Sequence, residues 1–419
     1  MQIAGLRGLV VDPTKVDLAK VVTPASDAPV EPAASAGPAR VVAAADAAGL
    51  RAWQDSGELV RDGSRAVYRY HQVFAADGRT LTRKLLLAAV KLAPWAEGTV
   101  RAHEVVPAAL RDAELVRLRA TGVQVMPLLG GFRDAAGEVD RLLKRAEAER
   151  PILEVTTPDG TLHRIWRERR AEVLGSLRPL FAPKKLTLLE GHARYDALLA
   201  YSDELAASTS YAASNYALMA LVALDDPTLQ LRGRHRVVRG TLVPAAVLEA
   251  ARRYFLVEPI AGAARDAAKL TASLAETLMH LPAFVVAFAG DPNAYKLTLS
   301  PDVSPVAEGV KVHRAVQKLD PIVVEELFVG RAMPGVTTTG ELDPVAALAQ
   351  LDPETPASAG ALQPRAGASA VIIQRALTLE QITHVAELGQ ALPAGSSAFH
   401  PQVVAGLVLH VLDPNEDLV

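Results

Sequence analysis

The 419-residue sequence contains no cysteine. This absence excludes disulfide bonds, thiolate metal sites and a cysteine nucleophile, and it leaves the redox compartment open. No apolar run approaches the roughly 18 residues that a membrane-spanning helix needs. The first eleven residues lack the charged start, the long apolar middle and the small-residue cleavage site of a signal peptide. We therefore expect a cytoplasmic protein with no membrane partner.

The sequence also lacks an excess of positive charge. It has 44 Lys and Arg against 47 Asp and Glu, which gives a formal net charge of −3. A protein that binds nucleic acid or an anionic membrane usually shows a clear basic excess. We therefore expect no nucleic-acid partner. The composition is that of an ordinary globular protein, long enough for two domains.

Several common catalytic motifs are missing. The sequence has no G-x-x-x-x-G-K-[ST] loop, no G-x-G-x-x-G after a strand and no G-x-S-x-G elbow. Its ten histidines do not have metalloprotease spacing, so a zinc enzyme is not expected and no residues are assigned to a metal.

Strand and helix patterns mix along the chain without regular alternation. This mixture predicts an α+β, or irregular α/β, fold. Strands are expected at 67–74, 81–92, 123–129, 152–155, 162–166, 216–224, 283–289, 295–299 and 370–374, and helices at 108–120, 138–150, 192–207, 247–254, 263–280 and 379–388. The stretches 24–40 and 352–368 are expected to be loops. A weakly marked boundary near residue 240 divides the chain into domains 1–240 and 241–419.

The most informative stretch is residues 184–195. An apolar run that predicts a buried strand ends at Glu190 and Gly191, and a helix that carries His192 and Arg194 follows at once. Free backbone N–H groups and the positive end of a helix make such a corner a phosphate site. Gly191 allows close approach of a ligand, and Arg194 offers a planar fork for phosphate oxygens. The alternative is a glycine turn with solvated charges.

His103 and Glu104 form a second candidate. A carboxylate held against a histidine and partly removed from water can act as a general base. The alternative is a surface His–Glu pair that precedes a helix.

Two more stretches could contact an anion. Arg234, His235 and Arg236 follow a predicted strand and suggest an anion site, although a solvated basic loop has the same composition. The small-residue loop 393–401, which contains Ser396 and Ser397, could surround a phosphate or a small hydroxyl compound. A simple connection between two elements has the same composition.

The order of these motifs resembles a known family. The chain resembles the large uncharacterised prokaryotic family called domain of unknown function ten-fifteen, and it is distantly similar to the ADP-dependent free serine kinases of the ParB/sulfiredoxin fold. The resemblance covers most of the chain and rests on 102–104 with Arg111, on 190–195, on 224–227, on 235–236 and on 388–406.

The resemblance implies a ParB/sulfiredoxin-like core in 1–240, and a C-terminal α/β domain in 241–419 that closes the site. It also implies nucleotide-dependent phosphorylation of a small hydroxyl metabolite such as free L-serine. The implied catalytic residues are Glu104, as the base, and His103. ATP or ADP with Mg²⁺ would be held by Glu190, Gly191, His192, Arg194, His235 and Arg236, and the substrate by Ser396 and Ser397.

The sequence departs from the family pattern at several of these positions. Ala193 stands where the family usually has histidine, Glu190 where it has aspartate, and Gly395 and Gln402 where it has lysines. Loss of cations from a phosphate site weakens binding and transition-state stabilisation. A catalytically silent nucleotide- or phosphate-metabolite-binding regulatory protein of the same fold therefore remains the alternative function. The sequence does not determine the acceptor, the nucleotide or the oligomeric state.

Overall fold

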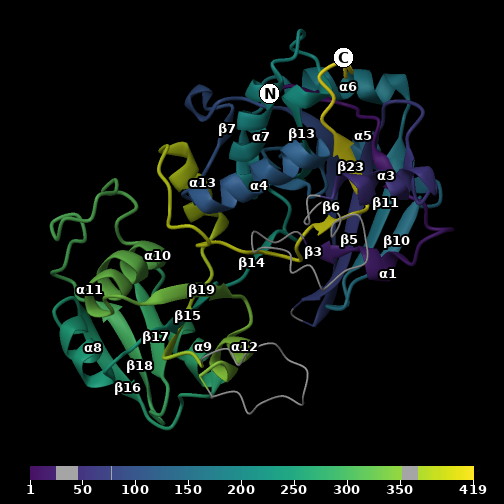
Figure 1. The fold of residues 1–419 in the computed structure, drawn as a ribbon. Coiled ribbons are helices and arrows are strands. Elements are labelled where there is room, and N and C mark those ends of the chain that lie inside the picture. The colour runs from purple at the N-terminus through teal and green to yellow at the C-terminus, as the bar shows by residue number, and fades with distance from the viewer. Residues whose placement is uncertain (25–45, 77, 352–366) are drawn as a thin grey trace. The chain divides into compact units, whose positions relative to one another are not determined.

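The computed structural model describes residues 1–24, 46–76, 78–351 and 367–419. The chain splits into two compact units, Met1–Gln230 with Phe399–Val419 (unit 1) and Leu231–Ala398 (unit 2). In Figure 1 the yellow strand β23 (Val408–Val411) lies among the purple and teal elements of unit 1, because it pairs with β2 (Leu9–Val11) and β8 (Val123–Gln124). The chain thus passes into unit 2 near residue 230 and returns, whereas the sequence placed one boundary near 240.

Unit 1 is built on a nine-stranded sheet. Its centre is a long hairpin, β5 (Val67–Ala76) and β6 (Arg79–Lys91), whose strands are mostly buried. Near-continuous burial means that both faces of these strands are covered. The strand order is β10-β11-β5-β6-β13-β9-β12-β7, with β1 also paired to β6. The further strands are β1 (Ile3–Ala4), β7 (Val100–Arg101), β9 (Leu128–Phe132), β10 (Leu153–Thr156), β11 (Leu162–Glu168), β12 (Leu186–Glu190) and β13 (Tyr216–Ala223).

Two neighbouring helices of unit 1, α4 (Ala108–Thr121) and α7 (His192–Leu205), contribute to its core. Leu118 of α4 and Tyr195 and Leu198 of α7 are buried in the same hydrophobic cluster as the sheet residues Leu128 and Leu188. Burial of an apolar helix face against a sheet is the main source of helix stability in a protein of this kind. The position of α7 is therefore fixed by packing as well as by its own sequence.

Smaller elements complete unit 1. They are α1 (Leu18–Val21), β3 (Thr23–Pro24), α3 (Ala47–Asp55), β4 (Leu59–Arg61), η1 (Trp95–Glu97), α5 (Glu138–Leu143), η2 (Lys144–Ala148), α6 (Ala171–Phe181), η3 (Ala213–Asn215), β21 (Phe399–His400) and β22 (Val404–Ala405). Strand β14 (Gln230–Leu231) lies where the chain passes from unit 1 to unit 2.

Unit 2 contains a six-stranded antiparallel sheet with the order β16-β18-β17-β20-β15-β19. Its strands are β15 (His235–Arg239), β16 (Phe255–Ile260), β17 (Ala283–Phe288), β18 (Ala294–Leu299), β19 (Thr337–Glu341) and β20 (Ala370–Gln374). The other elements are α8 (Pro244–Ala251), α9 (Ala267–Ala275), α10 (Asp320–Ile322), the π-helix η4 (Val323–Val329), α11 (Gly330–Ala332), α12 (Pro344–Ala349) and α13 (Leu379–Glu387). One core cluster joins buried residues of α9 and α12 to β17 and β20.

The mixed α/β class predicted from the sequence is confirmed, and some element boundaries differ. The strand expected at 123–129 is two strands, β8 and β9, and the helix expected at 138–150 ends as an α-helix at Leu143 and continues as η2. Most of the two predicted loops, 24–40 and 352–368, lies outside the described residues. In the described part of the chain, no helix has both the length and the apolar character needed to span a bilayer.

Candidate functional site

The candidate site of unit 1 begins with two parallel strands. Strands β7 and β12 pair in parallel, with Leu186 opposite Val100 and Thr187 opposite Arg101. Parallel neighbours end at the same edge of a sheet, where ligands of α/β proteins commonly bind. His103 and Glu104 follow the end of β7, and Glu190 is the last residue of β12. The topology therefore brings the two motifs predicted from the sequence to one edge.

Gly191 forms the turn from β12 into α7. Its φ of 92° lies in the left-handed region, where a side chain is strained. A Cβ atom at this position would lie 2.5 Å from Cδ2 of Leu128, so the turn also lacks room for a side chain. Helix α7 begins at His192, directly after this turn, and its first backbone N–H groups belong to the same corner.

Two buried histidines connect the corner to the end of β7. The His103 and His192 rings meet edge to face with centroids 4.7 Å apart, and the His103 backbone N–H points at Nε2 of His192 at 3.4 Å. Nδ1 of His103 lies 2.9 Å from the Leu188 carbonyl oxygen and donates its proton to it. Nε2 of His103 then faces Oε1 of Glu104 at 3.6 Å. Nε2 is therefore the ring atom through which His103 faces Glu104.

The two carboxylates of the corner have different surroundings. Glu104 is 7% exposed and lies beside His103. Oε1 of Glu190 accepts a hydrogen bond from the Phe399 backbone N–H at 3.2 Å. Burial lowers the pKa of the fully buried Arg83 to about 10, and the charge of the nearby Glu190 opposes this shift. Glu190 therefore helps to hold the C-terminal segment, whereas Glu104 is the carboxylate that faces Nε2 of His103.

Arg194 and Tyr195 lie in the first turn of α7. The Arg194 side chain is buried, and its Nη1 lies 3.9 Å from the Met126 sulfur. Its Nη2 is 3.0 Å from the place a Cβ of Gly191 would take, so the guanidinium packs over that glycine. The Tyr195 hydroxyl donates to Ala93 O at 2.8 Å and accepts from Ala93 N at 2.9 Å. Burial raises the pKa of Tyr195 to about 12, so the phenol stays protonated and anchors the helix.

Two alternatives were a glycine turn with solvated charges and a surface His–Glu pair, and both are wrong for this corner. His103, Glu104, His192 and Arg194 all lie among the buried residues, so they form neither a solvated turn nor a surface pair. The buried cluster results from the parallel pairing of two strands that are distant in sequence.

The remaining predicted site residues lie in unit 2. His235 and Arg236 are the first residues of β15 and are buried, so they do not form a solvated loop after a strand. Burial lowers the pKa of His235 to about 4, and its Nδ1 accepts a hydrogen bond from the Gln374 backbone N–H at 3.2 Å. Arg236 pairs with Glu325 at 2.5 Å. Arg236 therefore has an acidic partner, and His235 is uncharged at neutral pH.

Arg236 also holds the predicted hydroxyl loop. Its Nη1 donates to the Gly395 carbonyl oxygen at 2.8 Å. The neighbouring Ser396 and Ser397 are buried, and the Ser396 hydroxyl donates to the Pro393 carbonyl oxygen. The structure thus brings His235 and Arg236 together with this loop within unit 2.

A family model described as "Protein of unknown function (DUF1015)" matches residues 14–322. The match covers most of the chain. The chain belongs to the DUF1015 family. This result confirms the family predicted from the ordered motifs.

Solved structures with a distant likeness to this DUF1015 protein include a free serine kinase in complex with AMP, with 12% identity, a TM-score of 0.35 and coverage of 75% of this chain and 86% of that chain. A conserved hypothetical protein from Pyrococcus furiosus is 11% identical with a TM-score of 0.39, and the match covers 78% of this chain and 95% of that chain. SbnI with a C-terminal truncation, from Staphylococcus aureus, is 11% identical with a TM-score of 0.37, and the match covers 79% of this chain and 90% of that chain. None of the curated proteins matches the sequence. Likeness at this level assigns neither a ligand nor a reaction to the chain.

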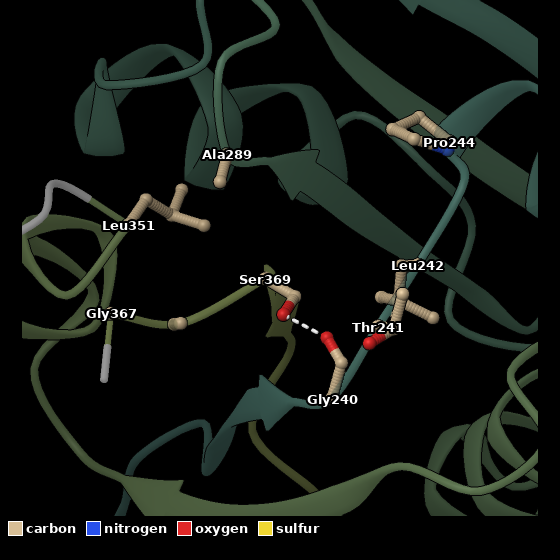
Figure 2. Close-up of a pocket in the computed structure, with 9 residues that line it drawn as sticks. Gly240, Thr241, Leu242, Pro244, Ala289, Leu351, Gly367 and Ser369 are labelled. Atoms are coloured by element: carbon tan, nitrogen blue, oxygen red, sulfur yellow. Dashed lines mark hydrogen bonds between the residues drawn. The ribbon is translucent and has the colours of Figure 1, made fainter. Parts of the chain in front are cut away.

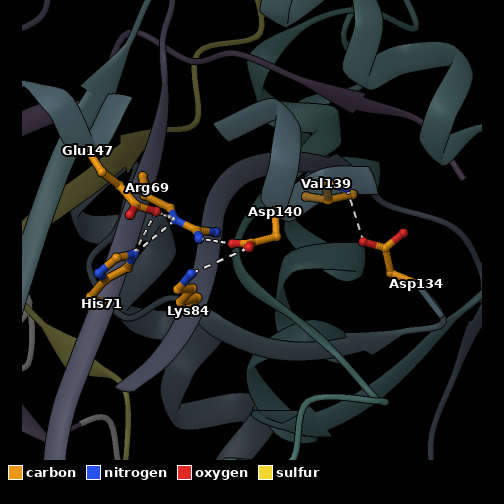
Figure 3. Close-up of polar contacts among 7 residues, drawn as sticks. All are labelled: Arg69, His71, Lys84, Asp134, Val139, Asp140 and Glu147. Atoms are coloured by element: carbon orange, nitrogen blue, oxygen red, sulfur yellow. Dashed lines mark hydrogen bonds and ion pairs between the residues drawn. The ribbon is translucent and has the colours of Figure 1, made fainter. Parts of the chain in front are cut away.

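The DUF1015 protein also has a buried charge network in unit 1 that the sequence did not predict (Figure 3). Arg69 is 2% exposed, pairs with Asp140, and donates from Nε to Glu147 Oε1 at 2.9 Å and to His71 Nε2 at 3.0 Å. Lys84 reaches Asp140 at 3.4 Å. Burial and the Arg69 charge lower the pKa of His71 to about 4. Every cation of this network has a carboxylate partner, so it joins the β5–β6 hairpin to α5 and η2.

A cavity of about 460 Å³ lies in unit 2, and Figure 2 shows nine of its lining residues. Backbone and small side chains from Gly240–Leu242 and Gly367–Ser369 form much of its wall. The Ser369 hydroxyl, which donates to the Gly240 carbonyl oxygen, ties these two segments together. Among the described residues that line this cavity, none is a site residue predicted from the sequence and none has a charged side chain.

Proposed function

We propose that this DUF1015 protein transfers a phosphoryl group from a nucleotide to a small hydroxyl compound such as free L-serine, with Glu104 as the base. One observation supports the proposal above all. The His103–Glu104 pair lies against the first turn of α7, where a helix N-terminus, a glycine and an arginine meet. A carboxylate beside a phosphate-binding turn is what hydroxyl phosphorylation requires.

Each group of the corner would have a defined role. The N–H groups of the first α7 turn and Arg194 would bind phosphate oxygens and stabilise the charge that grows on them. Glu104 would accept the hydroxyl proton as the substrate oxygen bonds to phosphorus. The bond from phosphorus to the bridging oxygen would break at the same time, and the nucleotide would leave one phosphate shorter. His103 would orient Glu104 and exchange the proton through Nε2.

The described residues contain no group of three His, Asp or Glu side chains placed to hold a metal ion. Mg²⁺ typically keeps several waters and binds through one or two carboxylates and the substrate phosphates. In this proposal Mg²⁺ would arrive with ATP or ADP and neutralise phosphate charge.

A second candidate function is nucleotide or phosphate-metabolite binding without turnover. The low exposure of the corner favours it, because His103 is 0% and Glu104 7% exposed. A substrate hydroxyl must reach the carboxylate before a proton can move. In this alternative the same turn binds phosphate and serves regulation.

The test is product formation by the full chain with Mg²⁺, ATP or ADP, and a panel of small hydroxyl compounds that includes L-serine. We expect a phosphorylated product from the wild type and a loss of about 100-fold or more in rate for Glu104→Gln, the usual size of a general-base effect. Glu97→Gln, an exposed carboxylate nearby, is the matched control and should keep full activity. Nucleotide binding without any product would favour the second candidate. No binding and no product would contradict both.

A further inference from the structure

Arg234 differs from the other two members of the basic stretch 234–236. Arg236 pairs with Glu325, and His235 is held uncharged by burial. Arg234 has no ion-pair partner within the described residues, and its buried Nε has no hydrogen-bond acceptor there. The residue itself is only partly buried, so the far end of the side chain can meet a ligand. A buried donor without a partner destabilises the fold and calls for an explanation.

Two glycines of unit 2 make room for this guanidinium. A Cβ at Gly340 would lie 2.5 Å from Nε of Arg234, and a Cβ at Gly395 would lie 3.2 Å from its Cζ. Gly395 has a φ of 66°, a conformation that also disfavours a side chain. The guanidinium therefore lies against the backbone of β19 and of the loop 393–397. It occupies space that a side chain at position 340 or 395 would need.

The surroundings fix this loop, and Arg234 forms no ion pair within the described residues. Arg236 binds the Gly395 carbonyl oxygen, and the Arg232 backbone N–H donates to the Ala398 carbonyl oxygen at 2.9 Å, so both ends of the loop are held. Glu325 forms its ion pair with Arg236, and Glu341, which follows Gly340, accepts from the Leu342 backbone N–H at 2.7 Å.

We propose that Arg234, with the loop that carries Ser396 and Ser397, is a phosphate-binding site of unit 2. A guanidinium is a planar fork that binds two phosphate oxygens, and a prearranged one loses little freedom on binding. The ligand is a phosphate group, either inorganic phosphate or the phosphate of a small ester. This site does not depend on the reaction proposed for unit 1, because all its residues lie in unit 2.

The test measures phosphate binding with the full chain in an Arg194→Gln background, which removes the arginine of the unit 1 corner. Isothermal titration with inorganic phosphate and with O-phospho-L-serine separates the two sources of the phosphate group. We expect at least one probe to bind, with affinity about tenfold weaker after Arg234→Gln, the effect of a charge-assisted bidentate contact. Gly340→Ala should weaken binding as well, because its Cβ displaces the guanidinium.

Arg232→Gln is the matched control, since it removes the same charge from an exposed residue two positions away. It should change the affinity by less than about twofold to threefold, as expected for a screened surface charge. Unchanged thermal unfolding of Arg234→Gln shows that the variant folds. The proposal is overturned if neither probe binds to the parent, if Arg234→Gln binds as tightly as the parent, or if Arg232→Gln loses as much affinity. A chain without kinase activity that still shows Arg234-dependent binding would contradict only the function proposed for unit 1.

Discussion

Unit 1 contains two buried charged clusters that differ in their construction. In the Arg69 network every cation meets a carboxylate, and the cluster joins a hairpin to a neighbouring helix. At the α7 corner, histidines, a carboxylate and an arginine surround a glycine turn and a helix N-terminus. Burial of charge alone therefore does not indicate a functional site. The useful distinction is whether the charges compensate one another or surround a backbone that can bind an anion.

The comparison predicts that the two clusters respond to mutation in opposite ways. Arg69→Met should lower the free energy of unfolding by about 2 kcal/mol, because Glu147 and Asp140 lose their buried partner. Nucleotide binding should not change. Urea unfolding checks the first effect and titration the second. Lys84→Met is the control and should cost less than about 1 kcal/mol, because Lys84 is partly exposed. A loss of nucleotide affinity in Arg69→Met would remove the distinction between the clusters.

Gly191→Ala tests the other cluster. The new Cβ meets Leu128 and the left-handed φ is strained, so the turn must shift. We expect nucleotide affinity to fall about tenfold, equivalent to about 1.4 kcal/mol. Gly137→Ala is the matched control, because Gly137 precedes α5 with a φ of 64° and has open space around it. That variant should bear backbone strain alone and bind nucleotide normally. Equal affinities of all three proteins would show that the α7 turn does not bind the nucleotide.

The dependence of stability on pH gives the smallest effect. Burial, followed by the Arg69 charge, lowers the pKa of His71 from 6.5 to about 4. Between these values the unfolded chain takes up a proton that the folded chain does not, so stability falls as the pH is lowered from about 6.5 to about 4. Burial also lowers the pKa values of His163 and His410 to about 4. His71→Gln should therefore reduce this slope without abolishing it. An unchanged slope in urea unfolding would show that His71 does not titrate in this way.

Much of the local structure could be predicted from the sequence. The strand that ends at Glu190, the glycine turn and the helix that follows were all expected, because apolar runs, glycine and helix-start patterns are local. Helix α4 and the hairpin of β10 and β11 were expected for the same reason. Elements that contain a residue atypical of that element were harder to predict. Helix α6 is an example, because it contains Pro179.

The environment of each side chain could not be predicted in the same way. The parallel pairing of β7 with β12 joins residues distant in sequence, so the contact between His103 and His192 has no local indication. The same limit applies to Arg236, whose pairing with Glu325 has no local indication in the sequence. Arg69 and Arg83 lie within strands, and only the folded sheet shows that they are buried.

The most direct test of the central claim is to measure nucleotide affinity and single-turnover phosphoryl transfer on the same preparation of Glu104→Gln. If Glu104 takes the substrate proton while the α7 turn and Arg194 bind phosphate, the variant should bind nucleotide within about threefold of the wild type and lose about 100-fold or more in transfer rate. A variant that transfers phosphate at the wild-type rate, or that loses nucleotide affinity and rate together, would contradict it.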